Sequence, residues 1–399
     1  MAIGLNNACL ITMDDRNDFF LTPGWIVIDG NRIREVSNCG QIPGDCSKVI
    51  DLKGKVVTPG LIDAHTHLGL YEEGNAKEGD DTNETSDPVT PHLRAIDGIS
   101  PRDIGFRAGR EGGVTCVCCL PGSTNVIGGL GSVVKTVGNV VDRMALKENC
   151  CLKVAFGENP KRTYGDKKES PVTRMAEAAL LREKLVQALE WKKENTSSSN
   201  SKRDLRQQVL IDVLDGKIFM RVHAHRADDI MTAIRIADEF GIHIVLEHCM
   251  EGHFIADEIA KRSIPVVYGP MFLGRVKQEL REMDESTPGV LAQAGVKVAL
   301  TTDHPEVSIR HLRLCAGVAA REGMPEKAAL RAITIDAAEI LGVSSRVGSL
   351  TPGKDADLVI WTGSPFEMMS RVEAVIIDGR LVYDRLGSFN GGGYWGELA

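Results

Sequence analysis

The chain has 399 residues, of which 43% are hydrophobic, so it can bury a substantial core. This length allows one large α/β barrel or two to three smaller domains. The formal net charge of -8, with no long run of Lys and Arg, argues against nucleic acid or an anionic membrane as the main partner. We therefore expect a small-molecule substrate.

The N-terminal residues lack a basic segment followed by a long apolar run, and no stretch approaches the roughly 20 apolar residues of a membrane span. We therefore expect a cytoplasmic protein. The ten cysteines show no regular spacing, and in such a protein most cysteines are small, buried hydrophobic side chains. Cys116 and Cys118 form a C-x-C pair, but neither a second pair nor a histidine pair follows at zinc-site spacing.

Residues 1–58 and 346–399 share a texture of short β segments separated by turns. In the first segment, the turn signals IDGNRI and LKGK separate β-branched runs. In the second segment, DADLVIWTGSP is followed by VEAVIIDGRLVYD. This pattern predicts one small β-sandwich domain that is formed by both termini, with a C-terminal tail after its second part.

Residues 59–345 alternate short apolar runs with amphipathic helical stretches such as ADDIMTAIRIADEFG. This alternation is typical of βα units, in which helical crossovers join parallel strands. It predicts a protein of the α/β class that contains a distorted TIM (β/α)8 barrel. The expected strands are LIDAHTH, GVTCVCCLPG, GSVVKTV, LKVAFGEN, IFMRVHAH, HIVLEHC, IPVVYGP and VKVALTTDHP.

Two segments interrupt the expected barrel. Residues 71–103 form a long polar loop after the first strand, at the barrel face where TIM-barrel chemistry takes place. Residues 171–213 have a helical pattern and are interpreted as an insertion. For this insertion a lid, a subunit contact and simple packing all remain open.

A His-x-His pair, His65 and His67, ends the first expected strand. Because residues i and i+2 of a strand face the same side, both imidazoles are available to one metal ion. On spacing alone, two incidental histidines explain the pair equally well. Other residues of metal-ligand type lie at the carboxyl ends of later strands, and such ends converge on one face of a barrel. They are Lys153, Glu158, His223, His225, His248 and Asp303.

These motifs resemble those of the amidohydrolase superfamily, and the resemblance covers nearly the whole chain. PGLIDAHTH is similar to the superfamily's first-strand metal motif, and VHAH, LEHC and TTDHP resemble its elements on strands five, six and eight. DADLVIWTGSP resembles its returning β domain. PGSTNVIGG and GENPKR resemble an imidazolonepropionase-like and prolidase-like subgroup, whose members often have no assigned substrate.

The resemblance implies a set of metal ligands. On strand five, His223 is the favoured ligand, while His225 contacts substrate or supports the ligands. The bridging ligand is either a carboxylated Lys153, which we favour, or Glu158. If neither binds, the site holds one ion rather than two. The full implied set, apart from the bridge, is His65, His67, His223, His248 and Asp303.

Imidazoles and a carboxylate suit Zn2+, while Mn2+, Fe2+ and Ni2+ also fit this donor set. A bound ion lowers the pKa of its water to about 7 and polarises a substrate carbonyl. Asp303 would then act as general acid and base, taking a proton from water and returning it to the leaving nitrogen. The candidate substrate contacts are His225, Asn125, Lys161, Arg162 and Tyr268.

We therefore predict a metal-dependent hydrolase that acts on a carbon–nitrogen bond other than an ordinary internal peptide bond. A cyclic amide, a dipeptide or a related amide is the expected substrate, and we expect a homo-oligomer. A metal-dependent deaminase of an aminated heterocycle is the alternative among enzymes. A non-catalytic scaffold is the alternative outside enzymes, and the retention of a ligand candidate at each strand position argues against it.

Overall fold

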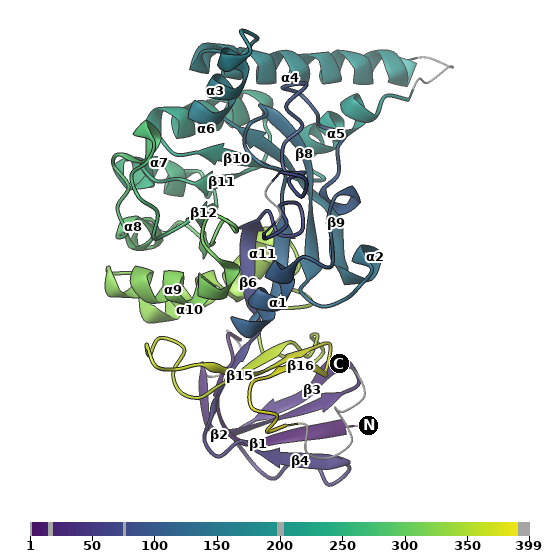
Figure 1. Ribbon diagram of the computed structural model, residues 1–399, viewed down its shortest axis with the longest axis vertical. Coiled ribbons are helices and arrows are strands. Elements are labelled where there is room, and N and C mark those ends of the chain that lie inside the picture. The colour runs from purple at the N-terminus through teal and green to yellow at the C-terminus, as the bar shows by residue number, and fades with distance from the viewer. Residues whose placement is uncertain (1, 15–18, 75–76, 198–202, 390–399) are drawn as a thin grey trace.

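The computed structural model describes residues 2–14, 19–74, 77–197 and 203–389. Within these residues the strands form two sheets of eight strands each. Figure 1 shows a helix-covered barrel above a smaller β domain, with the long helix α4 (Arg174–Ser197) at the end of the molecule far from that domain. The predicted α/β class, with a distorted barrel and a β domain built by both termini, is confirmed.

The β domain joins strands from the N-terminal and C-terminal parts of the chain, because β5 pairs with β14 in antiparallel register. Ile33 and Leu381, on the two strands at opposite ends of the sheet order, belong to the same buried apolar cluster. The sheet therefore curls around one core, and its strands are linked in a single hydrogen-bonded sheet rather than in two. The predicted C-terminal tail includes residues 390–399, which lie outside the described part of the chain. The strands of this domain are β1 (Ala2–Ile11), β2 (Phe20–Asp29), β3 (Arg32–Ser37), β4 (Lys48–Asp51), β5 (Val56–Pro59), β14 (Leu358–Trp361), β15 (Val372–Ile377) and β16 (Arg380–Asp384).

The barrel strands follow one another in chain order around the second sheet. Most of their residues are buried on both faces, which explains why they appear in the sequence as continuous apolar runs. All eight expected runs contain a strand. These strands are β6 (Leu61–Thr66), β7 (Val114–Cys119), β8 (Ile127–Lys135), β9 (Ala145–Ala155), β10 (Phe219–Ala224), β11 (Ile244–His248), β12 (Val266–Tyr268) and β13 (Val298–Leu300).

The direction of β8 differs from the expectation of parallel strands throughout. It runs antiparallel to both β7 and β9. Only residues 120–126 separate β7 from β8, and a parallel connection needs a dozen or more residues. The short loop therefore forces a hairpin at this point of the barrel.

Helices cover the outside of the barrel. In α6 the buried residues Ile230, Ala233, Ile234 and Ala237 recur at helical spacing, so one face packs on the sheet. The helix ends at Gly241, whose left-handed backbone (φ 64°) suits glycine. The helices are α1 (Ile104–Glu111), α2 (Val141–Met144), α3 (Glu158–Asp166), α4, α5 (Leu205–Leu214), α6 (Ala227–Phe240), α7 (Ala256–Lys261), α8 (Thr287–Gln293), α9 (Leu312–Arg321), α10 (Glu326–Ala332) and α11 (Ile335–Leu341), with 3-10 turns η1 (Ala95–Asp97), η2 (Gly252–Ile255), η3 (Gln278–Leu280) and η4 (Ile309–His311).

The segment predicted as a helical insertion contains α4 and α5, which pack against each other. None of the helices in the described ranges combines the length and the apolar character that crossing a membrane requires. In α4 the buried carboxylate of Glu177 accepts a hydrogen bond from the backbone N–H of Gly157, at 3.0 Å. The insertion is therefore tied to the end of β9, beside the expected metal ligands.

A buried carboxylate draws the last barrel strand to the first. Asp63 on β6 accepts hydrogen bonds from the hydroxyl groups of Thr301 and Thr302, both at 2.6 Å, and from the backbone N–H of Thr302 at 3.1 Å. The hydroxyl oxygen of Thr301 also accepts the backbone N–H of Asp303, at 3.0 Å. Because these residues follow β13 directly, the bonds fix Asp303 beside the His65 end of β6.

We expect Thr302→Val to destabilise the protein by about 1–3 kcal/mol, because it removes a buried hydrogen bond to the Asp63 carboxylate. Thr232→Val is a matched control, since the Thr232 hydroxyl lies on α6 and bonds only within that helix. Chemical unfolding of both variants measures the difference. Equal unfolding midpoints for the two variants would contradict this role of Thr302.

Candidate metal centre

The carboxyl ends of β6, β11 and β13 bring three predicted ligands together. The ring centroids of His65 and His248 are 4.8 Å apart, and those of His65 and His67 are 5.4 Å apart. Oδ1 of Asp303 lies 3.4 Å from Nε2 of both His65 and His67. His65, His248 and Asp303 each place a potential ligand atom within 4.8 Å of the other two.

Hydrogen bonds orient the imidazoles of this group. Nδ1 of His65 donates to the carboxylate of Glu247 at 2.6 Å. Nδ1 of His67 and Nδ1 of His248 each donate to a backbone carbonyl oxygen, at 2.8 and 2.7 Å. In each ring the other nitrogen, Nε2, is then left with its lone pair, as a metal ligand requires.

Burial keeps the imidazoles of His65 and His248 neutral. It lowers the pKa of His65 well below its ordinary value and also lowers the pKa of His248. Burial alone would raise the pKa of Asp303, but the surrounding histidines, His248 first, hold it below its usual range. The group therefore combines neutral nitrogen donors with an ionised carboxylate, which is the donor set that Zn2+ accepts.

The backbone at two of these positions is unusual. His248 has φ of 70° and Asp303 has φ of 52°, both in the left-handed region. This conformation costs a non-glycine residue on the order of 1–2 kcal/mol. His248 ends β11 and Asp303 lies three residues after β13, so both strained residues are predicted ligands at the carboxyl ends of barrel strands, where strain is typical of functional sites.

Lys153 lies inside the barrel between the two sets of histidines. Its Nζ is 3.2 Å from Nε2 of His65, and its side chain is buried. Burial lowers the pKa of Lys153 to about 8. Glu158, its rival as bridging ligand, instead begins α3, and its carboxylate accepts the backbone N–H of Glu279 at 3.0 Å. The geometry thus favours Lys153.

A second group contains His223, His225 and Glu279, whose potential ligand atoms also lie within 4.8 Å of one another. Nε2 of His225 is 3.7 Å from Oε1 of Glu279. Burial lowers the pKa of both histidines and raises that of Glu279. The ring of His223 is 4.5 Å from that of His248, so the second group adjoins the first.

Several atoms of both groups are buried without any hydrogen-bond partner among the described residues. They are both ring nitrogens of His223, Nδ1 of His225, Oε1 of Glu279 and Oδ1 of Asp303. Leaving a buried polar atom unpaired costs about 1–3 kcal/mol, so such clusters need an explanation. Divalent cations would satisfy one nitrogen of each of these histidines and the carboxylate oxygens of Asp303 and Glu279, and the residues present therefore fit a metal centre.

The structure also reveals buried supports that the sequence analysis missed. Glu247, which holds His65, bonds through its other oxygen to the Arg221 guanidinium, and Arg221 donates to the backbone oxygen of Ala64 at 2.9 Å. A sequence signal existed, because RVH and LEH each place a charged residue in a strand expected to be buried, where a charge needs a partner. Glu279 lies on η3 in a polar loop, where no sequence pattern indicates its position.

Two predicted substrate contacts are engaged elsewhere. The amide nitrogen of Asn125 donates to the backbone oxygens of Glu84 and Asp87, at 2.6 and 2.8 Å, and so pins the 71–103 loop. The hydroxyl of Tyr268 donates to the backbone oxygen of Asp284 at 2.9 Å. Both side chains are buried in the scaffold.

A cavity of about 590 Å³ opens onto His67. Residues of the 71–103 loop, the loop after β7 and α3 line it, and they include Tyr71, Asn83 and Arg162. Lys277, from the η3 segment, is the other cation in its lining. Arg162 has no carboxylate partner within the described ranges, whereas Lys161 is not among the lining residues.

Comparison with solved structures gives two informative matches. The crystal structure of an amidohydrolase from Thermotoga maritima MSB8 is 41% identical, with a TM-score of 0.92, and the match covers 96% of this chain and 100% of that one. A prolidase complexed with n-methylphosphonate-l-proline is 20% identical, with a TM-score of 0.62 and coverage of 96% and 100%. At this lower identity the likeness shows the fold alone.

Sequence comparison agrees. The model of the Amidohydrolase family matches residues 124–382. Amidohydrolase tasK of Hapsidospora irregularis is 28% identical over 90% of this chain, which spans only 40% of that relative's length. The 5'-deoxyadenosine deaminase of Methanothermobacter thermautotrophicus is 25% identical over 90% of this chain and 89% of its own length.

We expect Glu247→Gln to weaken zinc binding by about 10–100-fold, because the neutral amide no longer holds the His65 ring as a strong acceptor does. Competition with a chelator measures the zinc affinity. Glu258→Gln is the control and should bind zinc as the wild type does, because Glu258 lies on the surface of α7 and pairs only with Arg262, just after that helix.

Thermal unfolding shows whether Glu247→Gln is folded, since Arg221 loses its buried partner in this variant. A folded variant with wild-type zinc affinity would refute the supporting role of Glu247.

Proposed function

The chain belongs to the amidohydrolase family, and from this premise we propose that it hydrolyses a cyclic amide, a dipeptide or a related amide through a metal-activated water. Membership confirms the superfamily assignment made from the sequence motifs, and it makes the chain a hydrolase of carbon–nitrogen bonds. The observation that carries the proposal is the set of buried ligand atoms, at and beside the carboxyl ends of the barrel strands, that have no partner among the residues the structure describes.

We assign the ligands as follows. His65, His67, His248 and Asp303 would hold one ion, and His223 with Lys153 would complete a second position. His225 and Glu279 adjoin that second position, either as further ligands or as contacts to the substrate. Zn2+ is the ion that this donor set suits best, although Mn2+, Fe2+ and Ni2+ fit the same donors.

When bound, the ion supplies Lewis acidity to the attacking water and to the substrate carbonyl. Asp303 is placed for the proton transfers. Its carboxylate is ionised, and its Oδ1 has no hydrogen-bond partner in the described part of the chain, so it is free to accept a proton from the water. Asp303 would then return this proton to the leaving nitrogen, as a general acid.

Lys153 supports the proposal as the bridge. A neutral Lys153 amine would add carbon dioxide and release one proton to solvent, and the resulting carbamate would supply anionic oxygen ligands in place of one nitrogen. The Lys153 pKa of about 8 leaves part of the amine neutral near physiological pH, and its Nζ lies beside His65.

The cavity supports a small substrate with an anionic group. Its volume, about 590 Å³, is in the range of small-molecule sites. Arg162 presents a guanidinium that has no carboxylate partner among the described residues, and Lys277 is held toward the cavity by a 3.1 Å bond to Asn159, although Asp80 and Glu306 also line the cavity. A substrate carboxylate is the group that such a pair of cations recognises.

Deamination of an aminated heterocycle is the alternative, and the similarity to a 5'-deoxyadenosine deaminase favours it. The presence of two ligand groups argues for two ions and therefore for amide hydrolysis. The cytoplasmic location and the homo-oligomer stay predictions from the sequence.

Lys153→Met should remove one metal ion per chain from the histidine and carboxylate centre, because methionine keeps about the length of the side chain but removes its nitrogen ligand. Glu158→Gln is the matched comparison and should retain both ions. Elemental analysis of the purified variants measures the stoichiometry. Loss of an ion from Glu158→Gln alone would assign the bridge to Glu158 instead.

Asp303→Asn should lower turnover by at least about 100-fold, because it removes the proton acceptor. A panel of cyclic amides, dipeptides and aminated heterocycles, including 5'-deoxyadenosine, first identifies a substrate. Asp97→Asn, on the surface beside Arg94, is the control with unchanged turnover. Unchanged turnover of Asp303→Asn would contradict the proposed proton transfers. Release of ammonia from heterocycles, with no turnover of the amides, would identify the protein as a deaminase.

A further inference from the structure

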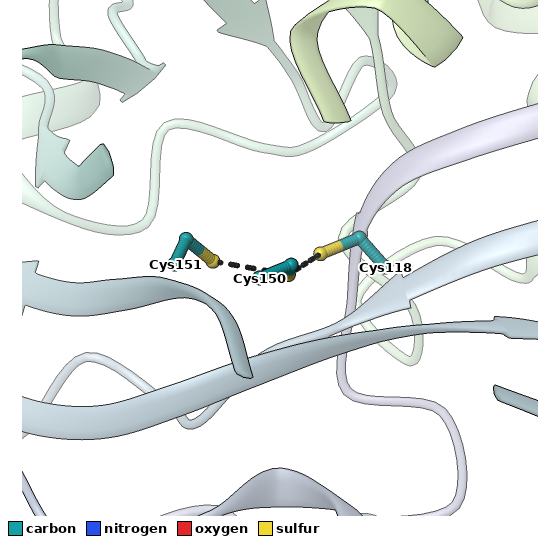
Figure 2. Close-up of side chains that lie close together, drawn as sticks. All are labelled: Cys118, Cys150 and Cys151. Carbon is teal, nitrogen blue, oxygen red and sulfur yellow. Dashed lines mark hydrogen bonds between the residues drawn. The ribbon is translucent and has the colours of Figure 1, made fainter. Parts of the chain in front are cut away.

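Three cysteine thiols meet in the interior of the barrel, apart from the histidines. Cys118 comes from β7, and Cys150 and Cys151 come from β9. Sγ of Cys150 is 3.8 Å from Sγ of Cys118 and 3.5 Å from Sγ of Cys151. Figure 2 shows Cys118 and Cys151 pointing toward Cys150 from opposite sides.

The spacing of these sulfur atoms fits a common metal ion. Thiolates bind zinc at about 2.3 Å, so two sulfurs on one tetrahedral ion stand about 3.8 Å apart. Two of the three pairs are already near this separation, and all three atoms lie within 4.8 Å of one another. A disulfide would need a separation of about 2.0 Å, and each of these cysteines is free.

The cluster is reached from the amino-terminal end of the barrel. A cavity of about 180 Å³ is lined by Cys150 and Cys151, by the first residues of β10 and by the end of α11. The cluster shares no residue with the predicted metal centre, although Lys153 follows Cys151 by only two residues on β9.

The charges around this cavity are mixed. Lys147, Lys217 and Arg221 line it together with Glu339, while Arg221 is paired with Glu247 and Lys217 with Asp212. Three thiolates around a divalent ion carry a net charge of -1, which Lys147, bonded to the backbone oxygen of Leu341 rather than to a carboxylate, can offset. The cavity also leaves room for water as a fourth ligand.

We propose that Cys118, Cys150 and Cys151 form a second metal site, which binds a thiophilic cation of the Zn2+ or Cu+ class. On binding, each thiol loses its proton to solvent and its sulfur forms a bond to the ion, with no change of oxidation state. Soft thiolate ligands select such ions, whereas the histidine and carboxylate centre presents only nitrogen and oxygen donors.

The test is a titration of metal-depleted, full-length protein with Co2+, without oxygen and with a phosphine reductant. Thiolate ligands give Co2+ a charge-transfer absorption in the near ultraviolet, which the catalytic centre cannot produce because it contains no thiol. The proposal predicts this absorption, together with one bound ion per chain beyond those of the catalytic centre.

Single Cys→Ser variants at the three positions should each lose the absorption and the extra ion. Cys116→Ser is the matched control, because Cys116 is buried in the same apolar cluster, two residues from Cys118 on β7. Absence of the absorption from the wild type, or its persistence in Cys118→Ser, would overturn the proposal.

A measurement on the wild type covers the case in which the serine variants do not fold. Cd2+ should slow the alkylation of Cys150 at least tenfold, while exposed Cys39 reacts at an unchanged rate. An unchanged rate at Cys150 in Cd2+ that fills the catalytic centre would equally overturn the proposal.

Discussion

The burial of ionisable side chains at one end of the barrel is the constraint on which the rest of the structure depends. Imidazoles and carboxylates removed from water need partners, and the fold supplies them only in part. Glu247 and two backbone carbonyls satisfy the outer nitrogens of His65, His67 and His248. The atoms that face the centre have no such partner in the described ranges, and divalent cations would complete them. The bonds between Asp63 and the residues after β13 place Asp303 in this group. The same hydrogen bonds therefore join the last barrel strand to the first and position a predicted ligand.

Much of this arrangement could be predicted from the sequence, because barrel strands buried on both faces appear as continuous apolar runs. The histidines and Asp303 were identifiable because they lie where those runs end. The direction of β8 was missed, although the seven residues between β7 and β8 are too few for a parallel crossover. Glu279 was not predictable, because packing of a polar loop, rather than any periodic pattern, brings it to His225.

The same distinction applies to the substrate side of the centre. Asn125 and Tyr268 were reasonable predictions from their places after barrel strands, but their polar atoms bond to backbone oxygens of neighbouring loops. Among the predicted substrate contacts, Arg162 lines the cavity and is the residue that we propose for selection of the substrate. C-x-C spacing alone suggested no metal site for Cys118. The thiol cluster depends on packing between strands that are not neighbours in the sheet, because Cys118 on β7 and Cys150 on β9 meet across the intervening strand β8.

The most direct test of the proposed metal centre is anomalous diffraction at the zinc absorption edge, from crystals of the full-length protein grown with Zn2+. If this centre binds two ions, zinc peaks will lie at the carboxyl ends of the barrel strands. One peak is expected among His65, His67 and Asp303, and the other beside His223 and Lys153. Crystals that contain zinc elsewhere, but show no peak among these side chains, would contradict the proposed metal centre.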